Sequence, residues 1–115
     1  MQNLKKQEEE SKRLGGRMLN MIRKLGKNET PRDYSFSGIE LGTMRARILN
    51  NNLWENTSLY CLSMNRKQIE DEVGAEIARM LLVNEKIRKI ELEGNKLQAQ
   101  TAREFAKVLK YNKRL

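Results

Sequence analysis

The sequence predicts an α/β fold, a short solenoid of about three strand–turn–helix units that follows an N-terminal helical arm. Two observations support this prediction. Hydrophobic positions recur with a 28-residue period, and within each recurrence their spacing changes from that of a strand to that of a helix. We assign residues 1–29 to the arm and residues 30–115 to the units, which cover about 33–58, 59–86 and 87–115.

The recurrence becomes visible when the chain is compared with itself at a 28-residue shift. One column holds asparagine in all three copies, at Asn56, Asn84 and Asn112. Five further columns are hydrophobic in every copy: Tyr34, Leu62 and Ile90; Phe36, Met64 and Leu92; Leu41, Ile69 and Leu97; Leu49, Ile77 and Phe105; Leu53, Leu81 and Leu109. So many columns in one register are hard to attribute to chance, so we interpret the repeat as structural. The alternative is an ordinary α/β domain in which the periodicity is accidental.

Each copy combines a strand with a helix. In the middle copy Leu62 and Met64 alternate with polar neighbours, which is typical of a short strand. Further on, Ile77 and Leu81 recur at helical spacing, and Asp71 stands where the N-cap of that helix is expected. The sequence therefore predicts a strand, a turn and a helix in every unit.

A single 28-residue unit cannot fold alone. Ordering it costs on the order of 40 kcal/mol, at about 1.5 kcal/mol per residue. One strand and one helix cannot recover that cost at about 25 cal/mol per Å² of buried apolar surface. Neighbouring units must therefore share a core. A column of small residues, Ala46, Gly74 and Ala102, marks where neighbouring helices would approach closely.

The I-x-x-I-x-L-x-x-N-x-L pattern of residues 87–97 resembles the leucine-rich repeat, and the 28-residue length resembles its ribonuclease-inhibitor-like class. The resemblance covers about residues 33–115. Proteins with similar repeats include ribonuclease inhibitor, Ran GTPase activators, tropomodulins and ciliary axoneme components. The resemblance implies a non-enzymatic, protein-binding scaffold or structural subunit of a larger assembly, in a cytoskeletal or ciliary setting. Regulation of a GTPase is an alternative that it also implies.

One departure from the repeat pattern concerns the turn after each strand. Asn95 occupies the position of the consensus asparagine, whose amide satisfies backbone groups in that turn. The equivalent positions hold Lys67, which cannot accept a hydrogen bond, and Ile39, which can neither donate nor accept one. We therefore expect those two turns to be built differently.

The N-terminal arm carries an amphipathic helical stripe. Its hydrophobic positions are Leu14, Met18, Met21, Ile22 and Leu25. The stripe is typical of a helix that caps the first unit, since arrays need such caps. Two alternatives stay open: a basic helix that docks on a membrane surface or an acidic partner, and a helix of a coiled coil.

Composition argues against enzymatic chemistry. The chain has no histidine, which removes histidine bases and ligands, and a single cysteine, Cys61, which cannot form an internal disulfide. Glu91 and Glu93 share a strand face, but such pairs are usually a solvated surface. We expect no catalytic residue, metal, cofactor or small-molecule substrate. The absence of a signal-peptide core and of a long apolar run predicts an intracellular protein, cytoplasmic or cytoskeletal, without a transmembrane segment.

The net charge of +8 favours acidic partners. The basic excess supports a second hypothesis, in which the arm binds an anionic surface: a membrane, nucleic acid or acidic protein tails. Several aromatic residues, such as Tyr34 and Phe105, fall in hydrophobic columns, so they do not form a stacking platform for bases. A strong dependence of binding on salt would distinguish this hypothesis from a protein-binding scaffold.

Strand residues between the core positions are the candidate partner-binding residues, because strands line the concave side of a curved stack. In order they are Asp33, Ser35 and Ser37, then Cys61, Ser63 and Asn65, then Lys89, Glu91 and Glu93. Trp54 is a further candidate, as an interface anchor or as a residue that packs on the arm.

The end of the sequence repeats the start of a unit. Leu115 stands in the column of Leu59 and Ile87, so the last helix would have an uncovered apolar edge. Three explanations are open: the chain is a fragment of a longer protein, a partner covers the edge, or two chains pair through it. The sequence decides neither the oligomeric state nor the identity of the partner.

Overall fold

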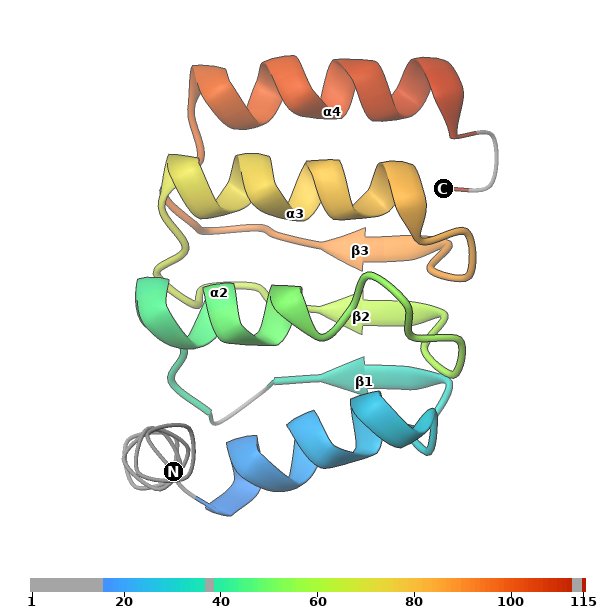
Figure 1. Ribbon diagram of the computed structural model, residues 1–115. Helices are drawn as coiled ribbons and strands as arrows, with labels where there is room; N and C mark the ends of the chain where they lie inside the picture. Colours follow the sequence, from blue (N-terminus) through green and yellow to red (C-terminus); the bar gives the residue numbers. More distant parts are fainter. Residues whose placement is uncertain (1–15, 37–38, 113–114) are drawn as a thin grey trace, which may run out of the picture.

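The computed structural model describes residues 16–36, 39–112 and 115. Three short strands lie behind a layer of helices that stack on one another along the sheet (Figure 1). A helix over residues 16–27 comes first. The elements after it are β1 (Asp33–Ser35), α2 (Gly42–Asn51), β2 (Cys61–Ser63), α3 (Asp71–Val83), β3 (Lys89–Glu91) and α4 (Ala99–Tyr111).

The three strands form a parallel sheet in the order β1-β2-β3. Tyr34 pairs with Leu62, and Leu62 pairs with Ile90, so each step across the sheet is the 28-residue step of the sequence. The predicted column of these three residues therefore lies side by side across the sheet. Each helix returns the chain to the start of the next strand, as a parallel connection requires.

The predicted solenoid is wrong. The described residues form one small compact body, with extents of 42 × 29 × 27 Å and a radius of gyration of 14.0 Å. The sheet has three strands of three residues each. The superhelical shape of a solenoid accumulates from a small rotation at every repeat, and so short a sheet does not develop it. The correct description is a compact α/β unit with four helices among the described residues, packed on a three-stranded parallel sheet.

The helix over residues 16–27 is an integral part of this body. Met18, Met21 and Leu25 are buried in the core, whereas Ile22 is partly buried against it. The stripe predicted for the arm thus contributes to the shared core, as the cap interpretation expects, while Leu14 lies outside the described residues.

The 28-residue repeat also begins earlier in the chain than the units that we assigned from the sequence. The side-chain amide of Asn56 donates a hydrogen bond to the Leu25 carbonyl oxygen at 2.9 Å. Asn84 donates to the Leu53 carbonyl oxygen at 2.6 Å across the same separation of 31 residues. The helix over residues 16–27 therefore holds the same place relative to the next unit as α2 does. The signal was present in the sequence, because Asn28 stands one repeat length before Asn56.

Helix α3 lies between α2 and α4 in the helical layer, and α4 lies at the edge of the layer (Figure 1). Seven residues of α3 are buried, whereas the buried residues of α4 are Thr101 and Val108. The two helices approach closely at Gly74, where an added Cβ would overlap the Thr101 side chain of α4 and lie 2.5 Å from a methyl group of Leu97, just before that helix. The small column predicted from sequence therefore marks a close contact at this position.

Asp71 does not cap its own helix, contrary to our prediction. The N-cap of α3 is Glu70, which makes no side-chain capping bond. The Asp71 carboxylate instead accepts hydrogen bonds from the backbone N–H groups of Gln98, Gln100 and Thr101 at 2.8 to 3.1 Å, at the start of α4. Burial opposes its ionisation, but these bonds and one from the Thr101 hydroxyl lower the pKa of Asp71 to about 2.

The turns after the strands differ from one another, as the sequence predicts. The Asn95 side chain accepts from the backbone N–H groups of Lys67 and Ile69, and donates to two carbonyl oxygens. Lys67 replaces only the donor half of this role: its ammonium donates to the Ile39 carbonyl oxygen at 2.7 Å.

Candidate binding site on the exposed sheet face

The sheet face opposite the core carries the predicted binding residues. Phe36, Leu62 and Met64 point into the core and are buried, so their neighbours along the strands point away from it. The register places three residues side by side at each of two levels. These levels are Asp33, Cys61 and Lys89, then Ser35, Ser63 and Glu91. Ser37 lies outside the described residues.

These six residues line a shallow hollow of about 320 Å³. The side contributed by β1 and β2 carries small or polar groups, of which Cys61 and Ser63 are half-buried, and Tyr34 and Leu62 also line it. The side contributed by β3 carries exposed charges of both signs, Lys89 and Glu91. The hollow is therefore suited to a polar protein surface rather than to an apolar ligand.

Cys61 is a poor nucleophile in this setting. A hydrogen bond to the Asp33 carboxylate, together with desolvation, raises the pKa of the Cys61 thiol. A raised pKa keeps the thiol protonated near neutral pH, and the thiolate is the reactive form. The thiol therefore contributes a polar contact to the hollow rather than a reactive group.

Asn65 and Glu93 continue the face beyond the hollow. The Asn65 side-chain oxygen accepts a hydrogen bond from the backbone N–H of Glu93 at 2.7 Å, so this asparagine also joins two neighbouring turns. The Glu93 side chain is exposed. Within the described residues no group of three or more cysteine, aspartate or glutamate side chains is arranged to hold a metal ion.

Trp54 lies away from this face. It is half-buried against the hydrophobic core, in the loop after α2. With Leu25 and Gly26 of the N-terminal helix it lines a second hollow, of about 440 Å³. Trp54 therefore lies beside the N-terminal helix, and both interpretations of it stay predictions.

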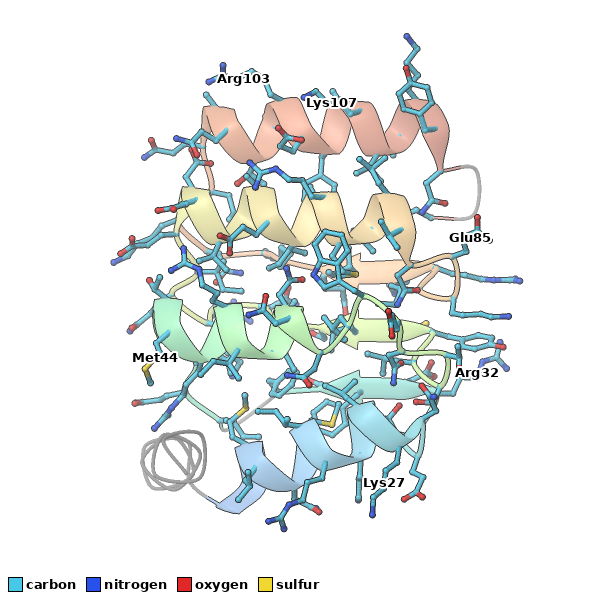
Figure 2. All side chains as sticks on the ribbon, in the orientation of Figure 1. Lys27, Arg32, Met44, Glu85, Arg103 and Lys107 are labelled. Atoms are coloured by element: carbon cyan, nitrogen blue, oxygen red, sulfur yellow. The ribbon has the colours of Figure 1, made fainter. Side chains whose placement is uncertain are left out.

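Sequence reasoning missed a basic cluster at the edge of the sheet, formed by Arg32, Tyr60 and Arg88. Arg32 and Arg88 both contact the Tyr60 ring, with guanidinium carbons 4.7 and 6.0 Å from the ring centroid. The three residues stand directly before β1, β2 and β3, and Figure 2 shows Arg32 at that edge of the molecule. The available signal was their 28-residue spacing.

Comparison with known proteins gives a likeness among solved structures. No family model matches the sequence, and a search of curated proteins finds no match. Among solved structures, the chain is similar to Leiomodin-1 Actin-Binding Site 2, with a TM-score of 0.71 and 20% sequence identity. The likeness covers 82% of this chain and 56% of that one, so this chain spans little more than half of its neighbour. At that identity the likeness shows the fold alone.

Among the described residues, no helix is both long enough and apolar enough to cross a bilayer.

Proposed function

We propose that this chain is a non-enzymatic protein-binding element of a cytoskeletal assembly, and that it contacts its partner through the exposed sheet face. The observation that carries the proposal is the uncovered face itself. Among the described residues, helices pack on one side of the sheet and none covers the six residues around the hollow on the other. A sheet face lined by small polar residues and flanked by charges is suited to a protein partner.

The cytoskeletal part of the proposal draws on the structural neighbour. That protein is described as an actin-binding site. Actin is therefore the first partner to test, and a cytoskeletal location follows if it binds. The resemblance to leucine-rich repeats stays a prediction.

A charge exchange on the sheet face tests the proposal. Exchanging the signs on β3 with the double variant Lys89→Glu/Glu91→Lys keeps the net charge of +8 and alters only the pattern in the hollow. We expect it to weaken binding to actin about tenfold or more in co-sedimentation with the full chain. The matched control is Arg23→Glu, on the exposed side of the N-terminal helix, which should change affinity less than about twofold.

Three results would count against the proposal. These are no binding of actin monomer or filament, equal binding by the exchanged variant, and loss of binding in the control. The last result would favour the basic arm as the binding element.

The basic cluster of Arg32, Tyr60 and Arg88 supports a second candidate function, the binding of acidic protein tails. Arg32 and Arg88 are exposed and both lie against Tyr60, which holds two positive charges at one edge. The variant Arg32→Glu/Arg88→Glu should abolish binding to a polyglutamate peptide, and the wild-type affinity should fall steeply with salt. Salt-independent binding, or equal binding by the variant, would reject this candidate.

A further inference from the structure

The surface of α4, the helix at the edge of the layer, is hydrophobic and uncovered in part (Figure 1). Leu109 is 63% exposed, and Phe105 is only partly buried. The small residues Ala102 and Ala106 on the same stripe are exposed as well. A solvent-facing stripe of this kind on an edge helix is typical of an interaction surface.

The stripe repeats the chemistry of a surface that is buried in α3. The equivalent residues of α3 stand one repeat length earlier. They are Gly74, Ile77, Ala78 and Leu81, and all are buried. Helix α4 packs on α3, and nothing among the described residues packs on α4 in turn. Helix α4 therefore presents a surface suited to receive another helix.

Ion pairs between the stacked helices show which charges such a helix would carry. Arg47 of α2 contacts Glu76 of α3 at 3.0 Å and Glu72 at 3.5 Å. Arg79 of α3 contacts Glu104 of α4 at 3.8 Å. At both contacts the earlier helix supplies an arginine and the following helix supplies glutamate.

Helix α4 carries basic residues at both of these positions. Arg103 stands two repeat lengths after Arg47, and Lys107 stands one repeat length after Arg79. Figure 2 shows both side chains at the edge of the molecule, on the side of α4 away from α3. Both residues are exposed, although Lys107 also lies 3.4 Å from Glu104. The stripe is thus flanked by the cations that elsewhere in this fold pair with glutamates of the next helix.

We propose that the outer face of α4 docks an acidic amphipathic helix of a partner protein. Its small and apolar residues pack on Phe105 and Leu109, and its glutamates pair with Arg103 and Lys107. This surface is separate from the sheet face, so the inference does not depend on the function proposed above.

Charge disfavours a second copy of the chain as the occupant. Pairing α4 with α4 would bring Arg103, Lys107 and Lys110 close to their own copies. Stacking α4 on the N-terminal helix of another copy would place Gly16 and Asn20, two repeat lengths earlier, where α3 has Glu72 and Glu76, so the cations would meet no carboxylate there. The first arrangement juxtaposes like charges and the second offers no ion pair, so both are less favourable than an acidic helix. An acidic helix meets the stripe without this penalty.

A defined peptide tests the proposal. The probe copies residues 70–84 and is held helical by a staple between positions 79 and 83, which are exposed in α3. This segment is chosen because Glu72 and Glu76 of α3 already form ion pairs with Arg47 of α2. We expect the labelled probe to bind the full chain in fluorescence anisotropy. The variant Arg103→Glu/Lys107→Glu should weaken it about tenfold or more.

Charge reversal on both sides makes the test specific. The probe with Glu72→Lys and Glu76→Lys should not bind the wild type but should bind Arg103→Glu/Lys107→Glu. Two control variants should leave binding of the original probe unchanged: Arg23→Glu, at the other end of the molecule, and the sheet-face variant Lys89→Glu/Glu91→Lys.

Other occupants give different results. Absence of binding, or equal binding by the reversed variant, would overturn the proposal. A dimer in light scattering that Leu109→Lys dissolves would identify a second copy as the occupant. Binding of the chain to phosphatidylserine vesicles, lost in Arg103→Glu/Lys107→Glu, would identify a membrane instead. Either outcome would replace the partner helix.

Discussion

Replacing Gly74 with alanine should destabilise the protein, although alanine is the better helix former. Gly74 lies inside α3 and is buried beneath α4. An added Cβ would lie 2.5 Å from the Leu97 Cδ2 atom and would also overlap the Thr101 hydroxyl. Real Cβ atoms are essentially never that close to a neighbour, so something must move.

The free energy depends on whether Thr101 can move aside. Its hydroxyl donates to the Asp71 carboxylate and lies 3.0 Å from the Asp71 carbonyl oxygen, so these bonds hold it in place. Overpacking a tight site costs about 1–3 kcal/mol, while replacing glycine in a helix gains about 0.5–1 kcal/mol. The cost of overpacking exceeds the gain in helix propensity, so we expect the free energy of unfolding to fall by about 1–2 kcal/mol. That loss should lower the midpoint of thermal unfolding by roughly 4–10 °C.

Urea and thermal unfolding followed by circular dichroism measure this change. The matched control is Gly26→Ala in the N-terminal helix, where an added Cβ meets nothing within 4 Å. The control should be neutral or stabilising by up to about 1 kcal/mol. If Gly74→Ala were as stable as the control, the close approach of α3 and α4 would be wrong.

Three further predictions concern hydrogen-bonded side chains. Asn84→Ala removes four hydrogen bonds to buried or partly buried backbone groups. It should cost about 3 kcal/mol in urea unfolding, and a loss below about 1 kcal/mol would contradict that role. Because the pKa of Asp71 is lowered to about 2, its contribution to stability is complete above the unfolded pKa of about 3.9 and is lost as pH falls toward 2. Asp71→Asn should therefore flatten the loss of stability between about pH 4 and pH 2, and an unchanged acid profile would refute this. Asp33→Asn should lower the raised pKa of Cys61 and speed its alkylation by iodoacetamide at pH 8 a few-fold; an equal or slower rate would contradict the contact.

Local patterns in the sequence predicted the strands and the exposed face well. Leu62 and Met64 alternate with polar residues, and one face of the sheet is buried, so the register fixes which residues point outward. The 28-residue step then places Cys61 beside Lys89 without further information. These inferences succeed because they depend on periodicity alone.

Contacts between units could not be predicted in the same way. Asp71 has the sequence context of a cap for its own helix, yet it meets the free N–H groups of the next helix, about one repeat length away. Lys67 lacks an acceptor, but its long side chain reaches a carbonyl oxygen of the preceding turn. The solenoid prediction failed for a related reason, since a repeated pattern does not say how many units are needed before a superhelical shape develops. Local propensity gives way to tertiary contacts at such positions.

The position of α4 at the edge of the helical layer has a consequence for how the protein opens. The main contacts between helices join neighbours, α2 with α3 and α3 with α4, and the hydrogen bonds of the asparagine column span 31 residues at each step. Detaching α4 therefore breaks contacts with one neighbour only, and exposes just two buried residues of its own. Amide protons of α4 should exchange with solvent through local opening, well before those of α3. A ligand that covers α4 would slow this exchange, so protection at the last helix would report occupancy directly.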